Sequence, residues 1–317
     1  MIELENFTKV YKSFGNKKVA CNNINFVAKK NAITGLIGAN GAGKTTILKA
    51  ICSIHYATSG NVFIYDKNNN KFNVKDSPLV AKSLIGFVPE NPILLNNLTV
   101  YEYLNFINSV NRESREKAEF CISREKSEIC ESCERLVNRK NRGESKKFHN
   151  AENLNLKKII SLLNLDSVVN QKINSLSKGY KQRLSFASCL INDKEILVLD
   201  EPASGLDPNQ IIEIRKLIKS LSQNKTIILS THIMQEAQNL CDNIIILDKG
   251  NVLISGTIEE ILTSTKTKDL ESAYIKLTNQ GDAHEKSLKS TSTDSKNTSK
   301  MKSADNQNDT HNIGKQK

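Results

Sequence analysis

The feature that most constrains this chain is a glycine loop between an apolar run and a helical stretch. Residues 38–45 read GANGAGKT and fit the pattern G-x-x-x-x-G-K-[ST]. The preceding apolar run, residues 33–37, has the length of a buried strand, and residues 46–54 have the apolar spacing of a helix. A strand that passes through a glycine loop into a helix is the setting in which such a loop binds phosphate.

The residue types of this loop explain its chemistry. Glycines lack a Cβ atom, so the backbone can curl and point its N–H groups at phosphate oxygens. The helix that follows adds the positive end of its dipole. Lys44 supplies a mobile cation for the β and γ phosphates, and the Thr45 hydroxyl suits Mg²⁺. The expected nucleotide-binding residues of this segment are Gly38, Asn40, Gly41, Gly43, Lys44, Thr45 and Thr46.

A second segment ends an apolar run with two acids. Residues 196–202 read ILVLDEP, which places Asp200 at the end of a buried strand and Glu201 directly after it. Asp200 can reach the shell of a metal ion, and Glu201 can orient and deprotonate an attacking water. The alternative is a pair of acids that only caps a strand end. The phosphate loop upstream favours the catalytic interpretation.

Further short apolar runs predict the fold class. Strand-like runs cover residues 2–10, 24–27 and 62–65, and two more, 195–199 and 226–229, each follow a helical stretch. Such alternation predicts an α/β domain with a mainly parallel sheet and an antiparallel β part. A closing hairpin is predicted around the Lys249–Gly250 turn.

Composition limits the class of protein. The chain has 317 residues, is 38% hydrophobic and 25% charged, and carries a net charge of +11. No apolar run approaches the roughly 18–20 residues that span a bilayer, and the polar start is no signal peptide. We therefore expect a cytoplasmic protein whose membrane role would need a partner. The positive charge is compatible with nucleic acid, an anionic membrane face, nucleotide or a lysine-rich solvated surface.

Three more segments complete an ordered set. Residues 176–183 read LSKGYKQR, residues 204–208 read SGLDP and residues 230–232 read STH. In this order the five segments closely resemble the nucleotide-binding subunit of an ABC transporter. LSKGYKQR alone reads as a capped helix or an anion-binding helix N-terminus. It resembles the ABC signature motif, with Lys178 and Tyr180 in place of the commonest Gly and Gln, as in the drug-export, sodium-export and gliding-type branch.

The resemblance implies a mechanism that uses two subunits. Two ATPases would press together head to tail with ATP between the phosphate loop of one and the signature of the other. Ser177 and Gly179 would then touch the γ-phosphate bound by the partner. Asp207 resembles the aspartate that shapes this contact, and His232 the γ-phosphate-sensing histidine.

Two further positions follow from the resemblance. Tyr11 stands where the family has an aromatic residue that stacks on adenine; the alternative is an ordinary core or surface aromatic. Glu90 stands in the place of the family's glutamine loop, which is a departure. Its carboxylate can contact Mg²⁺ or a metal-bound water, so the predicted metal ligands are Thr45, Asp200 and Glu90; the alternative is a hinge to the helical part.

We expect three parts along the chain. Residues 1–255 would form an ABC-type P-loop nucleotide-binding domain, whose helical subdomain covers about 91–185 and includes a charged insert at 111–150. Residues 256–277 would form a short helical extension, with helices at 257–262 and 270–277. Residues 278–317 are polar and read as disordered.

The insert contains several potential metal ligands. Cys121, Cys130 and Cys133 lie within it, near His149. Because a zinc site normally needs four ligands in tighter pairs, free thiols are favoured over zinc.

The predicted function is ATP hydrolysis that powers a separate membrane permease, of an export type. The expected cofactors are ATP and Mg²⁺, and the expected assembly is a homodimer, or a heterodimer with a related ATPase, on the inner face of the cell membrane. Exposed members of Leu94, Leu95, Tyr101 and Tyr103 would contact the permease. One alternative is a soluble ABC ATPase acting on the ribosome or nucleic acid, although no nucleic acid is expected. The other is a subunit that binds ATP without turnover, against which Glu201 and His232 argue.

Overall fold

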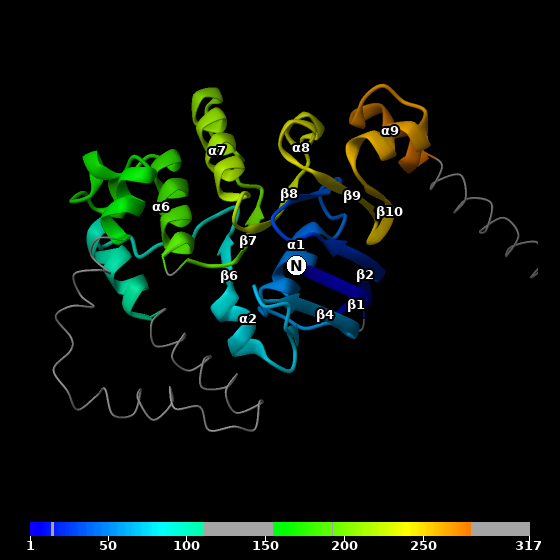
Figure 1. The fold of residues 1–317 in the computed structure, drawn as a ribbon, viewed down its shortest axis with the longest axis horizontal. Helices are drawn as coiled ribbons and strands as arrows, with labels where there is room; N and C mark the ends of the chain where they lie inside the picture. Colours follow the sequence, from blue (N-terminus) through cyan, green and yellow to red (C-terminus); the bar gives the residue numbers. More distant parts are fainter. Residues whose placement is uncertain (14–15, 111–154, 192, 280–317) are drawn as a thin grey trace, which may run out of the picture. The chain divides into compact units, whose positions relative to one another are not determined.

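A computed structural model describes residues 1–13, 16–110, 155–191 and 193–279 (Figure 1). The predicted charged insert with its cysteines and His149, and residues 280–317 of the predicted disordered tail, lie outside the described residues. The chain divides into two compact units, Met1–Ile261 and Leu262–Lys317, the second described as far as residue 279. In the described part, no helix is both long and apolar enough to cross a membrane.

The first unit begins with a four-stranded antiparallel sheet in the order β2-β1-β4-β5. In β2 the side chains of Ile24, Phe26 and Ala28 are buried and those between them are exposed, which is the alternation of a sheet with one solvated face. The antiparallel part predicted from the sequence is thus confirmed. The strands are β1 (Ile2–Ser13), β2 (Asn16–Ala28), β4 (Ser59–Tyr65) and β5 (Lys71–Asn73).

A second sheet has six strands in the order β10-β9-β3-β8-β7-β6. All neighbours pair in parallel except β10, which forms an antiparallel hairpin with β9 at the predicted turn. Every residue of β3, β7 and β8 is buried, as expected for strands covered on both faces. The strands are β3 (Ile33–Ile37), β6 (Ile85–Val88), β7 (Ile196–Asp200), β8 (Thr226–Thr231), β9 (Asn243–Asp248) and β10 (Asn251–Gly256).

The helices of the first unit connect these strands. Figure 1 shows strands β6, β7 and β8 side by side, with helices such as α6 and α7 in the connections between them. Further helical residues are 100–110 and 155–162, with short 3₁₀ turns at Asp166–Val168 and Ile173–Ser175. The labelled helices are α1 (Lys44–Ile51), α2 (Pro78–Leu84), α6 (Lys178–Leu190), α7 (Pro208–Leu221), α8 (Met234–Leu240) and α9 (Ile258–Thr265).

Helix α1 contacts strands of both sheets. Its Ile47 and Leu48 belong to one buried core together with Phe7 of β1, Val198 of β7 and Ile228 of β8. The helix was predicted to continue to residue 54 but ends at Ile51, since the backbone turns into the left-handed region two residues later. The glycine loop is therefore fixed at both of its ends by buried elements, which holds its backbone in place.

The second unit begins at Leu262, within α9. A helix covers residues 270–279, and the Lys276 Nζ atom donates a hydrogen bond of 2.8 Å to the Thr265 carbonyl. Both helices that the sequence predicted at 257–262 and 270–277 are present, each somewhat longer. The proposed domain boundary at residue 255 stays a prediction.

Candidate functional site

The carboxyl ends of four neighbouring parallel strands carry the predicted chemistry. The loop 38–45 follows β3, Asp200 and Glu201 end and follow β7, His232 follows β8 and Glu90 comes two residues after β6. Because β3, β8, β7 and β6 are adjacent and parallel, their carboxyl ends meet at one edge of the sheet. Ligands of open α/β sheets bind outside this edge.

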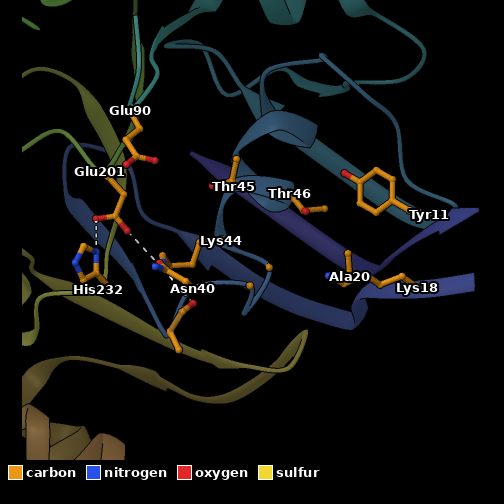
Figure 2. A pocket seen from close by; sticks show the side chains of 13 residues that line it. Tyr11, Lys18, Ala20, Asn40, Lys44, Thr45, Thr46, Glu90, Glu201 and His232 are labelled. Atoms are coloured by element: carbon orange, nitrogen blue, oxygen red, sulfur yellow. Dashed lines mark hydrogen bonds and ion pairs between the residues drawn. The ribbon is translucent and has the colours of Figure 1, made fainter. Parts of the chain in front are cut away.

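Most of these residues line a cavity of about 350 Å³ (Figure 2). Figure 2 shows Tyr11, Lys18 and Ala20 at one end, Glu90, Glu201 and His232 at the other, and Lys44, Thr45 and Thr46 between them. Ten of the predicted site residues meet here, from elements far apart in the sequence. They are Tyr11, Asn40, Gly41, Gly43, Lys44, Thr45, Thr46, Glu90, Glu201 and His232.

Three positions of the loop require glycine for steric reasons. Gly43 has φ 109°, and a Cβ atom there would lie 2.8 Å from the Ala20 carbonyl oxygen. A Cβ atom on Gly38 would lie 2.4 Å from the Leu247 carbonyl oxygen. Gly41 has φ 86° with open space around it. Only glycine adopts these positions at low free energy, so the curled loop depends on them.

Lys44 is buried at the base of the cavity, with a 6% exposed side chain. Its Nζ atom donates to the carbonyl oxygens of Gly38 at 2.7 Å and Ala39 at 3.3 Å. It also lies 3.4 Å from the Glu201 Oε1 atom. The ammonium group is therefore held inside the loop, where a bound phosphate would meet it.

Glu201 connects the phosphate loop to the histidine. Its Oε2 atom lies 2.9 Å from His232 Nδ1, while Oε1 faces Lys44. The carboxylate side chain is 11% exposed and the histidine 49%. Glu201 also has φ 47°, an uncommon conformation for a residue with a side chain. Non-glycine residues in such conformations cluster at functional sites, and this one places the carboxylate at the cavity.

Behind the cavity, two hydroxyl groups hold Asp200. Thr45 Oγ1 donates to Asp200 Oδ1 at 3.2 Å, and Ser230 Oγ donates to the same oxygen at 2.6 Å. Ser230 Oγ in turn accepts a hydrogen bond of 2.9 Å from the Glu201 backbone N–H. Asp200 is 4% exposed and Ser230 fully buried. This network fixes both acids relative to the loop.

The oxygen atoms near Thr45 fit Mg²⁺. Mg²⁺ prefers hard oxygen ligands and is commonly bound by one or two protein groups together with substrate phosphates. The Thr45 hydroxyl and the Asp200 carboxylate supply such oxygens within hydrogen-bond distance of each other. Within the described residues, no group of three or more His, Cys, Asp or Glu side chains forms a metal cage of its own. The Glu90 Oε1 atom instead accepts a contact of 3.5 Å from Ser204 Oγ.

Tyr11 forms the far end of the cavity with 42% of its surface exposed. Its hydroxyl lies 3.2 Å from His55 Nε2, and the two rings meet edge to face at a centroid distance of 6.1 Å. Burial lowers the pKa of His55, with a further contribution from Lys9. The structure thus presents a held aromatic ring suited to stacking on a base.

Three predicted residues lie away from this cavity and have structural contacts of their own. Ser177 caps α6 by accepting from the Tyr180 backbone N–H, and Asp207 caps α7 by accepting from the Gln210 N–H. A Cβ atom on Gly179 would lie 2.6 Å from the Gln210 side chain. These contacts account for the serine, the aspartate and the glycine within a single chain. A role of the three residues toward a partner subunit remains a proposal. Gly38 and Asp200 support the cavity from behind.

The sequence interpretation missed four residues of the site. Lys18 and Ala20 line the cavity because β2 pairs with β1, which sets Lys18 opposite Tyr11. Ala39 lines it from within the loop. Ser230 was read only as part of a motif, yet strand pairing sets it directly opposite Asp200. The available signal was a hydroxyl residue at the end of one predicted strand and an acidic residue at the end of another.

Comparison with known proteins agrees with this geometry. The family model "ABC transporter" matches residues 21–204, more than half of the chain. The methionine import ATP-binding protein MetN of Mannheimia succiniciproducens is 29% identical and aligns over 91% of this chain and 74% of its own. The uncharacterized ABC transporter ATP-binding protein YxlF of Bacillus subtilis is 26% identical over 84% of this chain and 74% of its own.

Solved structures share the fold. An ATP-binding subunit of an ABC transporter aligns with a TM-score of 0.68 at 23% identity, over 88% of this chain and 99% of its own. A dimeric bacterial ABC transporter cassette aligns with a TM-score of 0.63 at 26% identity, over 81% of this chain and 98% of its own. Family, fold and cavity agree with the predicted fold class. The chain therefore belongs to the ABC transporter family and is an ABC ATPase, the ATP-binding part of such a transporter.

Proposed function

We propose that this chain hydrolyses ATP at the described cavity, closes on ATP against a second ATPase subunit and so drives a separate membrane permease. The observation that carries the proposal is the position of Glu201. Its carboxylate contacts Lys44 of the phosphate loop on one side and His232 on the other, at the cavity that the loop lines. A base, a phosphate-binding cation and a sensor thus share one site.

The cavity offers a place for each part of ATP. The loop N–H groups and Lys44 would hold the phosphates, and the exposed ring of Tyr11 would stack on the base. Thr45 and Asp200, with Glu90 at the edge of the cavity, would hold Mg²⁺, which would neutralise negative charge that develops on the phosphates. Lys18, opposite Tyr11, adds a cation at the base end of the cavity.

The contact between Lys44 and Glu201 suggests how binding prepares hydrolysis. A bound phosphate would compete with Glu201 for the Lys44 ammonium, since both are anions near one cation. A carboxylate released from that ion pair is free to accept a proton from a water molecule. The water oxygen then bonds to the γ-phosphorus, the bond to the β-γ bridging oxygen breaks, and ADP and phosphate leave. His232, hydrogen-bonded to Glu201, would orient the carboxylate and contact the γ-phosphate.

The dimeric part of the proposal rests on residues outside the cavity. Ser177 is exposed at the N-terminus of α6, where a helix end and a hydroxyl suit an anion. With Gly179 and Asp207 it would face the ATP bound by a partner subunit. A similar cassette has been solved as a dimer, which supports this arrangement. The partner would be a second copy of this chain or a related ATPase.

We propose that residues 1–255 form the nucleotide-binding domain. Its helical part, at about 91–185, would contact the permease at the inner face of the membrane. Leu95 and Tyr101, both expected there, are 47% and 44% exposed, and their neighbour Ile93 is 95% exposed, which supports this contact. Tyr103, also expected there, is instead only 6% exposed and belongs to the core.

Export is the proposed direction of transport. It rests on Glu90, Lys178 and Tyr180, which resemble the export branch. The relatives named for methionine import support the opposite direction. ATP-driven uptake of substrate into inside-out vesicles that contain the complex would support export, and ATP-driven loss of preloaded substrate would support import.

The experiment that tests the proposal uses Glu201→Gln. This variant should bind ATP without turning it over, so ATP should convert it from monomer to dimer when followed by light scattering after size exclusion, with and without Mg²⁺. Lys44→Ala is the matched control, because it leaves Glu201 intact and removes the phosphate cation. Normal hydrolysis by Glu201→Gln would refute the assigned base, and a monomer that binds ATP would refute the closure of two copies of this chain.

A further inference from the structure

The turn that carries His232 is linked by a hydrogen bond to a buried carboxylate on α8. Thr231, the last residue of β8, is 1% exposed, and its Oγ1 atom donates to Glu236 Oε2 at 3.2 Å. The same Oγ1 atom accepts a hydrogen bond of 3.0 Å from the Ile233 backbone N–H. The hydroxyl therefore holds the backbone on both sides of His232.

Glu236 extends this contact to helix α7. Its Oε1 atom lies 3.4 Å from Arg215 Nη2, and its side chain is 11% exposed. The pair lies beside a small cavity lined mainly by apolar side chains, among them Ile214 and Leu229. The Arg215 side chain is 32% exposed, so water screens part of the attraction between the two charges. The Arg215 Nε atom is buried and has no hydrogen-bond partner among the described residues. Glu236 is therefore the acid that this guanidinium contacts in the described part of the chain.

Helix α7 begins at the segment expected to face a second subunit. Asp207, the last residue before α7, caps it, and Arg215 lies two turns further along. A displacement of α7 would move Arg215 and with it Glu236 and Thr231. The contacts form one continuous path from the start of α7 to the turn at His232.

We propose that Arg215, Glu236 and Thr231 are positioning residues that hold His232 against Glu201 and couple its orientation to α7. This inference rests on the proposed function, in which His232 and Glu201 act in ATP hydrolysis. None of the three lines the cavity, so their loss should change ATP affinity less than turnover. Their loss lowers turnover by letting the histidine turn move.

The test removes the hydroxyl without changing the shape of the side chain. Thr231→Val should lower kcat about 10- to 100-fold while KM for ATP stays within about twofold, because a misplaced catalytic group reduces turnover more than binding. Thr231→Ser is the matched control, since it retains the hydroxyl and should restore most of kcat. Glu236→Gln should lower kcat to a smaller extent, because its amide oxygen still accepts from Thr231 while the charge facing Arg215 is lost.

A second readout does not depend on hydrolysis. The chain has five histidines, and the ring signals of His232 can be assigned in ¹H–¹⁵N spectra by their loss in His232→Ala. These signals should shift or broaden in Thr231→Val and stay near their normal positions in Thr231→Ser. Unchanged His232 signals and unchanged kcat in a folded Thr231→Val protein would overturn the inference. If the unmodified protein hydrolysed no ATP, the proposed function would fail, while the spectra would still report whether the path holds His232.

Discussion

Ser230→Ala tests whether one buried hydroxyl holds both acids of the site. Ser230 is fully buried, donates to Asp200 Oδ1 at 2.6 Å and accepts from the Glu201 N–H at 2.9 Å. Alanine removes both contacts and leaves a carboxylate that is 4% exposed with one donor fewer. A hydrogen bond to a charged group contributes about 1.5–3 kcal/mol and a neutral one about 0.5–1.5 kcal/mol. We therefore expect the free energy of unfolding to fall by about 2–4.5 kcal/mol.

Urea denaturation followed by far-UV circular dichroism measures this change, because the chain has no tryptophan to report by fluorescence. Ser204→Ala is the control. Its hydroxyl makes a contact of 3.5 Å with Glu90, so the change should stay within about 0.5 kcal/mol. Turnover should also fall in Ser230→Ala, since Glu201 loses the anchor of its backbone.

A Ser230→Ala protein with an unfolding free energy within about 0.5 kcal/mol of the unmodified protein, and with unchanged kcat, would refute this reasoning. It would mean that neither hydrogen bond is formed in solution. If stability fell while kcat stayed the same, Ser230 would support the fold alone.

Three more outcomes are expected. Gly43→Ala should lower the unfolding free energy by about 1–3 kcal/mol because it adds both backbone strain and a clash. Gly41 has a positive φ but open space around it, so Gly41→Ala should lower the unfolding free energy less in the same urea series. Equal losses of stability in the two variants would contradict the steric account. Burial raises the pKa of Cys21 and Cys189 to about 12. Iodoacetamide at pH 8 should therefore modify neither thiol in the folded protein and both thiols in urea, as measured by peptide mass spectrometry. Rapid labelling of the folded protein would show that the two thiols are accessible. Burial lowers the pKa of His55, so the unfolded chain takes up a proton first as pH falls through about 6.5, and stability should drop there. His55→Gln should flatten the pH dependence of stability between pH 7.5 and 5.5. An unchanged slope would show that His55 is not desolvated in the folded protein.

The sequence alone predicted those parts of the site that are contiguous in the chain. The glycine spacing, Lys44 and Thr45 form a local motif that can be recognised without knowledge of distant residues. The apolar run before them was predicted to be a buried strand. The acids at 200–201 were recognised because an apolar strand ends there. The fold class was predicted from the alternation of short apolar runs and helical stretches, because apolar periodicity indicates which faces of a strand or helix are buried.

Contacts between distant residues were not predictable in this way. Thr45 and Asp200 are 155 positions apart, and their hydrogen bond exists only because β3 and β7 both pair with β8. Lys18 joins the cavity only through the pairing of β1 with β2. A helix end was misplaced by three residues because a local left-handed turn leaves no apolar pattern.

The sequence by itself determined the phosphate loop, its lysine and the order of the acidic and histidine segments, because local residue types set backbone freedom and charge. Only the tertiary structure decided that Glu201 lies between Lys44 and His232, that Ser230 holds Asp200 and that Tyr103 is core rather than surface. The physical reason is that strand register and helix packing fix distances between side chains that no spacing along the chain records.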